Sequence, residues 1–140
     1  MTRLKYLDTS VLLESFIKNA PRKADCIGII SAVTQGQEKV LLSTLNIGEL
    51  FHILLNRENL SIDYINNYLE RTIHLPGVEL VELDDLILTQ GFKISSKCQI
   101  DLADACAIAI MQKHKLKYIY SLDSNFDKFP EILRLTELKV

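Results

Sequence analysis

The sequence predicts an α/β protein in which a mostly parallel sheet is covered by helices on both faces. Short apolar runs alternate with longer segments whose apolar residues recur every three or four positions, as in proteins built around a parallel sheet. The connections are long enough to cross from one parallel strand to the next. The chain has 140 residues, of which 48% are hydrophobic and 24% charged. We therefore expect residues 1–140 to form a single globular domain.

Two strands and three helices are expected in the first half of the chain. The strands are predicted at residues 3–7 and 39–44, and the helices at residues 11–19, 23–35 and 49–57. Ser10 is the predicted N-cap of the first helix, because a serine hydroxyl accepts hydrogen bonds from the free amides of a first turn. Ile27, Ile30 and Val33 are expected to form the buried stripe of the second helix.

The second half is expected to alternate in the same way. Three helices are predicted to begin at capping side chains, which are Ser61, Asp84 and Asp101. They are expected to end near residues 75, 97 and 115. Strands are predicted at residues 78–83, 117–122 and 134–138, the last at an edge of the sheet, with a short helix or turn at residues 125–133.

Charge and cysteine content exclude several classes of protein. A formal net charge of −2 argues against a protein that coats nucleic acid through a broadly basic surface. The three cysteines form no CxxC pair, so we expect reduced thiols packed as small hydrophobic groups rather than a zinc site. Polar residues interrupt every apolar run well short of a membrane span, and the N-terminus lacks a signal-peptide pattern. A cytoplasmic protein that spans no membrane is expected.

Four acidic residues stand at the edges of apolar segments, which is an unusual position for a carboxylate. They are Asp8, Glu49, Asp104 and Asp123. Carboxylates are poor strand formers and are costly to bury unpaired, so their placement requires an explanation. Asp8 and Asp123 each follow a predicted strand, at the edge where parallel sheets form ligand crevices. We interpret the four acids as converging on a divalent cation.

Each acid also has a purely structural explanation. Asp8 could cap the helix after the first strand, and Asp123 could close an Asx-turn. Glu49 could be a first-turn glutamate that the helix dipole favours. Asp101 is best explained as an N-cap, whereas Asp104 is harder to explain because the six residues after it are expected to be deeply packed. The four acids together are therefore a stronger signal than any one alone.

Carboxylate oxygens are hard ligands that suit Mg²⁺ and Mn²⁺ equally. Such ions retain water, bind a phosphate oxygen and lower the pKa of an attacking water. Without a cation, clustered acids would repel one another and some of their pKa values would rise. The acids therefore predict a Mg²⁺ or Mn²⁺ site suited to phosphodiester cleavage.

Four motifs in a fixed order carry a resemblance to a known family. They are YLDTSVLL at residues 6–13, STLNIGEL at 43–50, DLADACAIA at 101–109 and YIYSLDSNFDKF at 118–129. At these residues the chain resembles the PIN-domain family, particularly the VapC-like toxins of prokaryotic toxin–antitoxin pairs. The resemblance runs over nearly the whole chain, and the order and spacing of the four motifs are more specific than any single one.

The resemblance implies a five-stranded, mainly parallel sheet and an acidic pocket in which a cation-activated water cleaves RNA, as in an endoribonuclease. Carried over by position, the catalytic and metal-binding acids would be Asp8, Glu49, Asp104 and Asp123. The residues that would support the site are Thr9, Ser10, Asp101, Ser121 and Asn125. The family often has an aspartate where this chain has Asn125, which puts a second metal position in doubt.

The resemblance also implies partners, namely an RNA substrate, an antitoxin that blocks the acids and a second copy of the chain in a homodimer. Two alternatives stay open. One is a PIN-like module that has lost catalysis and serves in RNA binding or assembly. The other is a phosphoryl-transfer domain with Asp8 as a phosphoaspartate nucleophile. No base-reading motif is visible, so the sequence does not identify the RNA.

Overall fold

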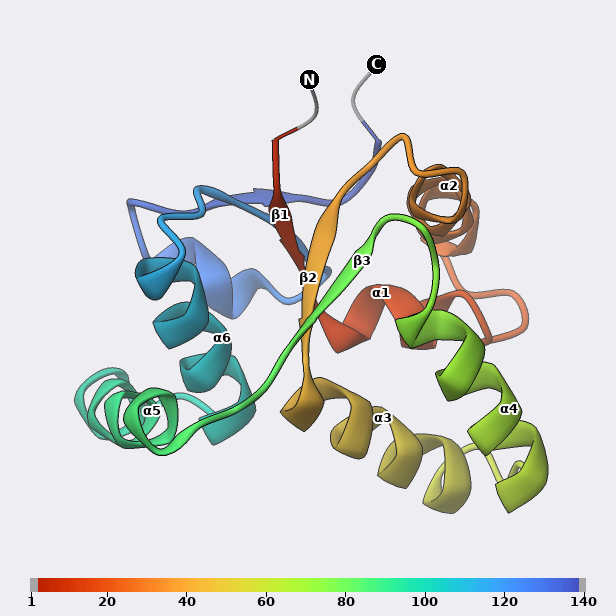
Figure 1. The fold of residues 1–140 in the computed structure, drawn as a ribbon, viewed down its shortest axis with the longest axis horizontal. Coiled ribbons are helices and arrows are strands. Elements are labelled where there is room, and N and C mark those ends of the chain that lie inside the picture. Colours follow the sequence, from red (N-terminus) through yellow and green to blue (C-terminus); the bar gives the residue numbers. More distant parts are fainter. Residues whose placement is uncertain (1–2, 139–140) are drawn as a thin grey trace.

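The structure, a computed structural model that describes residues 3–138, contains a five-stranded parallel sheet (Figure 1). The strand order is β3-β2-β1-β4-β5, and every neighbouring pair is parallel. The strands are β1 (Lys5–Leu7), β2 (Val40–Ser43), β3 (Val78–Val81), β4 (Tyr118–Tyr120) and β5 (Leu133–Leu135). The predicted fold class, the parallel sheet and the edge position of the last strand are confirmed.

Helices cover both faces of the sheet, as predicted (Figure 1). On one face lie α1 (Thr9–Glu14), α2 (Lys23–Thr34), α3 (Thr44–Asn56) and α4 (Ile62–Ile73). On the other face lie α5 (Asp85–Cys98), α6 (Leu102–Lys113) and the 3₁₀ helix η1 (Ser124–Lys128). Each face therefore has its own hydrophobic core.

The central strands supply apolar side chains to both cores. In β1, Tyr6 packs in the core under α5 and α6, whereas its neighbour Leu7 packs in the core under α1 to α4. In β4, Ile119 and Tyr120 divide in the same way. Successive side chains of a strand point to opposite faces, so a strand covered on both sides reads as a continuous apolar run. This double burial explains why the strands were recognisable in the sequence.

Three predicted helix starts are confirmed by their capping bonds. Ser61, Asp84 and Asp101 each accept a hydrogen bond from a first-turn amide of α4, α5 and α6, at 3.2, 2.9 and 2.8 Å. These bonds satisfy amides that have no partner within their own helix. The short polar side chain before an apolar periodic segment was therefore a reliable signal.

The predicted N-cap of the first helix was wrong. Asp8, not Ser10, occupies the N-cap position of α1, and the helix begins at Thr9. The Ser10 hydroxyl donates to the Asp8 carboxylate at 2.7 Å and accepts from the N–H of Leu122 at 3.1 Å. The Ser10 hydroxyl is thus hydrogen-bonded to the segment after β4 and does not cap the helix.

Two other expectations require correction. Ile27 is 48% exposed, because the stripe of α2 that meets the sheet runs through Cys26, Ile29 and Val33 instead. Of the predicted stripe, Val33 alone is fully buried. The third helix begins at residue 44 rather than 49, because Ser43 forms a reciprocal capping box with the third residue of the helix.

The three cysteines are free thiols, as expected, and Cys26 and Cys106 are buried. Burial raises the pKa of Cys26 to about 11, as is typical of a thiol packed as a small hydrophobic group.

Within residues 3–138, no helix is both long and apolar enough to cross a membrane.

Gly77 marks a close approach between the turn before β3 and the segment before β2. A Cβ atom at this position would lie 2.1 Å from the carbonyl oxygen of Glu38 and 2.6 Å from that of Val33. We therefore expect Gly77→Ala to lower the free energy of unfolding by about 2 kcal/mol, measured by urea denaturation, because backbone atoms must shift.

Gly28→Ala is the matched control for this prediction. Gly28 lies within α2, and a Cβ atom there would meet no heavy atom within 4 Å. Alanine is the better helix former, so this variant should be more stable by up to about 1 kcal/mol. Equal stability of the Gly77→Ala variant and the wild-type protein would contradict the close contact between Gly77 and the backbone carbonyls of Val33 and Glu38.

Candidate active site

The predicted acids gather where the order of the strands reverses, between β1 and β4. Asp8 directly follows β1, and Asp123 comes three residues after the end of β4. The N–H of Asp8 donates to the carbonyl oxygen of Tyr120 at 2.9 Å, which joins the two strand ends. Parallel sheets form their ligand crevices at the carboxyl ends of strands where the order reverses. The topology therefore explains why two residues so far apart in sequence lie at the same place on the sheet.

Two serine hydroxyls hold the carboxylate of Asp8, which is 6% exposed. Ser10 and Ser121 each donate to its Oδ2 atom at 2.7 Å. The Ser121 hydroxyl also accepts from the N–H of Asp123 at 3.0 Å. The two predicted supporting serines thus lie at the site and fix the orientation of one acid relative to the backbone of another.

Asp8 occupies a capping position without using its side chain as a cap. No capping bond from its carboxylate to α1 is found among the described residues. Burial raises the pKa of Asp8, and the negative charge of Asp123 adds to this effect. The hydrogen bonds from Ser121 and Ser10 act in the opposite direction by stabilising the charged form. Asp8 therefore takes the N-cap position of α1, as its structural explanation required, but its carboxylate is held mainly by the two serines.

Asp104 lies close to two other acids of the site, Asp8 and Asp123. Asp104 lies in the first turn of α6, is half-buried and has Asp123 as a neighbour that raises its pKa. Burial raises the pKa of Asp104 to about 8, and the charges of Asp8 and Asp123 contribute to the rise. Acids this close favour the protonated form of one of them, and a bound cation would remove the same repulsion.

Glu49 lies beside Thr9 and is half-buried. Because α3 begins at Thr44, Glu49 is not in its first turn, and the explanation through the helix dipole is wrong. Burial raises the pKa of Glu49, a hydrogen bond from Thr9 opposes the rise, and the charges of Asp8 and Asp101 reinforce it. Glu49 is thus close enough to Asp8 and Asp101 for their negative charges to raise its pKa.

A buried hydrogen-bond network behind Thr9 was not predicted from the sequence. The hydroxyls of Tyr6 and Ser43 both donate to Oδ1 of Asn46, and Nδ2 of Asn46 donates to the Thr9 hydroxyl at 3.0 Å. With its oxygen occupied by an amide donor, the Thr9 hydroxyl is free to donate to Glu49. Asn46 three residues after Ser43, just after a strand, was the sequence signal that could have revealed the network.

Asp101 and Asn125 lie at the margin of the site. Asp101 is exposed and caps α6, but its charge contributes to the raised pKa values of Glu49 and Asp104. Asn125 is exposed, and its N–H donates to Oδ1 of Asp123 at 2.9 Å. Asp123 therefore does close a local turn, as its structural explanation required, while its carboxyl also meets Asp104.

The chemistry of the donor set fits Mg²⁺ or Mn²⁺, although the carboxylates do not form a closed cage. Within the part of the chain that the structure describes, no three acid, histidine or cysteine side chains are grouped as ready metal ligands. Mg²⁺ keeps several of its waters and commonly takes one or two carboxylates. The Asp104–Asp123 pair, with Asp8 near by, meets that requirement.

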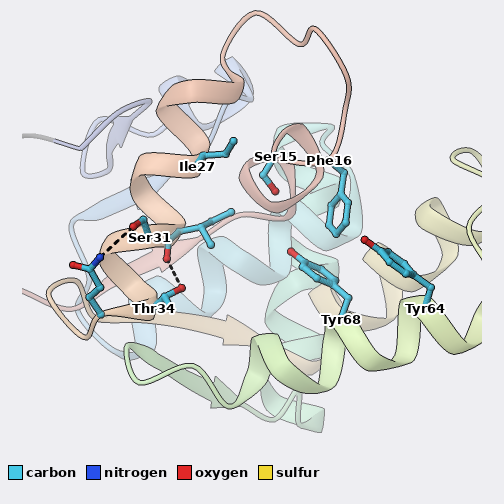
Figure 2. Close-up of a pocket in the computed structure, with 9 residues that line it drawn as sticks. Ser15, Phe16, Ile27, Ser31, Thr34, Tyr64 and Tyr68 are labelled. Atoms are coloured by element: carbon cyan, nitrogen blue, oxygen red, sulfur yellow. Dashed lines mark hydrogen bonds between the residues drawn. The ribbon is translucent and has the colours of Figure 1, made fainter.

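An apolar groove lies between α1, α2 and α4, on the helical face that also carries Thr9 and Ser10. Figure 2 shows Phe16, Tyr64 and Tyr68 along one side of this groove and Ile27 on the other. Its volume is about 450 Å³. The exposure of Ile27 that the sequence did not predict is explained by its place in this groove.

Comparison with known proteins identifies similar folds. The model of the PIN domain family matches residues 5–132. VapC20 of Mycobacterium tuberculosis, described as a sarcin–ricin loop cleaving toxin, has a TM-score of 0.73 and 16% identity, over 90% of this chain and 94% of its own. A toxin–antitoxin complex from Klebsiella pneumoniae has a TM-score of 0.65 and 14% identity, covering 96% and 99% of the two chains.

A third similar structure is VapBC2 of Rickettsia felis, bound to a DNA fragment from its promoter. It has a TM-score of 0.68 and 9% identity, over 95% of this chain and 98% of its own. At these identities the three likenesses establish the fold alone. No curated protein matches the sequence.

Removal of the charge at position 104 should stabilise the metal-free protein. Because the pKa of Asp104 is higher in the folded than in the unfolded state, its ionisation opposes folding, increasingly as pH rises toward 8. Asp104→Asn should therefore raise the free energy of unfolding by about 1–2 kcal/mol at pH 8, after allowance for solvent screening. Urea denaturation with chelator would measure this gain, which should be smaller at pH 5.

Asp101→Asn removes the same charge from the same helix and serves as the control. Asparagine caps a helix as well as aspartate does, and Asp101 is exposed, so its stability should change by less than about 0.5 kcal/mol. A loss of stability in Asp104→Asn at pH 8 would show that the acids do not repel one another as described.

Proposed function

The chain belongs to the PIN-domain family, and on this premise we propose that it is a metal-dependent endoribonuclease and the toxin of a VapBC-type toxin–antitoxin pair. One observation chiefly supports the proposal. Asp8, Asp104 and Asp123 come from separate segments, and the charge of Asp123 raises the pKa of both other acids. Such a cluster is unfavourable for folding and is typical of a site that binds positive charge.

The proposed cofactor is Mg²⁺ or Mn²⁺. Asp104 and Asp123 would hold it directly, and Asp8 would hold it directly or through water, with Ser10 and Ser121 fixing the orientation of Asp8. When bound, the cation neutralises charge on a phosphate oxygen and lowers the pKa of an attacking water. These acids are the proposed metal-binding residues of the site.

Glu49 is proposed to orient the attacking water. Its carboxylate lies beside the hydroxyl of Thr9, which lowers the pKa of Glu49 and is itself fixed by a hydrogen bond from Asn46. The water would lose a proton to solvent as its oxygen forms a new bond to phosphorus, while the bond from phosphorus to the leaving sugar oxygen breaks and that oxygen takes up a proton from solvent. Orientation of a nucleophile in line with the leaving group is a major contribution to phosphoryl chemistry.

An antitoxin is the proposed protein partner, supported by the similar folds of toxin–antitoxin complexes. The groove between α1, α2 and α4 would suit an apolar segment of that partner. Asp8 is the N-cap of α1, and Ser15, its C-cap, lines the groove, so the two residues are separated by a helical rise of about 10 Å. A partner chain seated in the groove would need only a short extension to reach the acids.

A homodimer is implied by the resemblance to VapC-like toxins alone. Action in the cytoplasm follows from the proposed RNA substrate and antitoxin. The phosphoaspartate alternative is not favoured by any contact, because the two serine hydroxyls direct their hydrogen bonds to Asp8 and would have to leave it before it could act as a nucleophile.

The proposal is tested by incubation of the purified protein with structured and single-stranded RNAs in Mg²⁺, Mn²⁺ or chelator. We expect cleavage only with a divalent cation, and a loss of about 100-fold or more in kcat for Asp104→Asn, which corresponds to about 2.7 kcal/mol. Asp101→Asn should retain most of the activity, because Asp101 lies at the margin of the site.

Cleavage that persists in chelator, or in the Asp104→Asn variant at the wild-type rate, would rule out the proposed site. Metal binding by the wild-type protein without cleavage of any RNA would favour the alternative of a catalytically inactive PIN-like module. Calorimetric titration with Mn²⁺ distinguishes these cases, since it detects the cation whether or not RNA is cut.

A further inference from the structure

A second cavity, distinct from the acidic site, lies between α5, α6 and the segment that follows η1. Its volume is about 350 Å³. Three lysines line it, Lys93, Lys97 and Lys128, against a single acid, Glu131. We call this cavity the lysine groove. It is a local concentration of positive charge on a chain whose formal net charge is −2.

The three lysines are available for a ligand. Lys93 and Lys97 are one helical turn apart on α5 and so lie on the same face, with Cβ atoms about 5–6 Å apart. All three side chains are exposed. In the described part of the chain, every ion pair found involves a different cation, for example Lys113 with Asp84 at 3.6 Å. Unlike Lys113, the groove lysines are not committed to a carboxylate.

The chain itself keeps the lysine groove close to the acids. Lys97 is four residues before Asp101, so their Cα atoms are at most about 14 Å apart. Lys128 is the last residue of the 3₁₀ helix that Asp123 caps, a rise of about 10 Å over five residues. Two of its lysines are therefore within about 10–14 Å of Asp123 and Asp101, respectively, measured along the backbone.

We propose that the lysine groove holds the backbone phosphates of single-stranded RNA on one side of the bond to be cut. The inference rests on the proposed nuclease function and names residues that position its substrate. Lysine is a point-charge ligand for phosphate, and phosphate contacts position a nucleic acid without reading its sequence. A local lysine track also explains how a chain with negative net charge and a negative active site retains a polyanion.

The test compares two triple variants with the same change in charge. The first is Lys93→Gln with Lys97→Gln and Lys128→Gln. The control is Lys18→Gln with Lys39→Gln and Lys117→Gln. Lys39 and Lys117 directly precede β2 and β4, so they lie at the amino ends of the strands, whereas Asp8 and Asp123 follow the carboxyl ends. Thermal denaturation checks that both variants fold.

We expect the groove variant to raise KM for single-stranded RNA about tenfold or more, with kcat changed less than twofold. Its binding to the same RNA in chelator should depend less steeply on salt. The logarithmic slope should fall by about 2, or roughly 0.7 for each phosphate that a lysine no longer neutralises. The control variant should match the wild-type protein in both measurements.

The outcomes separate this inference from the proposed function. If the wild-type protein cleaves RNA and the groove variant has the KM and salt slope of the control, the lysine groove is overturned while the nuclease stands. If the wild-type protein cleaves nothing but the groove variant alone loses RNA binding, the nuclease fails and the groove is supported. Wild-type RNA binding by the groove variant with loss of an acidic protein partner would overturn the assignment to RNA.

Discussion

The pairing of β1 with β4 at the centre of the sheet is the contact on which the candidate site depends. It brings two strand ends from opposite parts of the chain to one point, where the N–H of Asp8 meets the carbonyl oxygen of Tyr120. The Ser121 hydroxyl then reaches the carboxylate of Asp8, and α6 brings Asp104 to Asp123. The concentration of negative charge at this edge is thus a consequence of the topology, not of any single segment.

The fold tolerates the repulsion between these acids because the rest of the structure supplies stabilising interactions. Two hydrophobic cores, one on each face of the sheet, supply the stabilising burial. Around the acids, hydroxyl donors from Ser10, Ser121 and Thr9 stabilise carboxylates that burial would otherwise protonate. Functional sites commonly break the rules that the remainder of a protein obeys, and a bound cation would remove the repulsion that this one retains.

Much of the fold was predictable because local signals agreed with the tertiary structure. Strands covered on both faces were continuous apolar runs, and the caps Ser61, Asp84 and Asp101 preceded regular apolar periodicity. The predictions that were wrong concern residues whose position or role is set by contacts with distant parts of the chain. Ser10 was assigned to a cap, but the segment after β4 recruits its hydroxyl. Ile27 fitted a helical stripe, but contact with the sheet selects the face through Cys26.

At the site, too, local sequence signals identified some features, whereas distant contacts determined others. The four acids could be selected from the sequence because carboxylates beside apolar runs are unusual, and their motifs resembled a family. Their proximity could not be predicted, since the effect of Asp123 on Asp104 depends on how α6 packs beside the end of β4. The spacing of Ser43 and Asn46 signals a local contact, but not the distant partners of Asn46, one of which lies 40 positions away. The lysine groove likewise combines α5 with η1, so its lysines form no run in the sequence.

The most direct test of the central claim is a crystal structure of the protein with Mn²⁺, in which anomalous scattering locates the ion. We predict a peak bound by carboxylate oxygens of Asp104 and Asp123, with Asp8 in contact directly or through one water. A peak at another place on the molecule, or none at millimolar Mn²⁺ with the three carboxylates turned apart, would contradict the account.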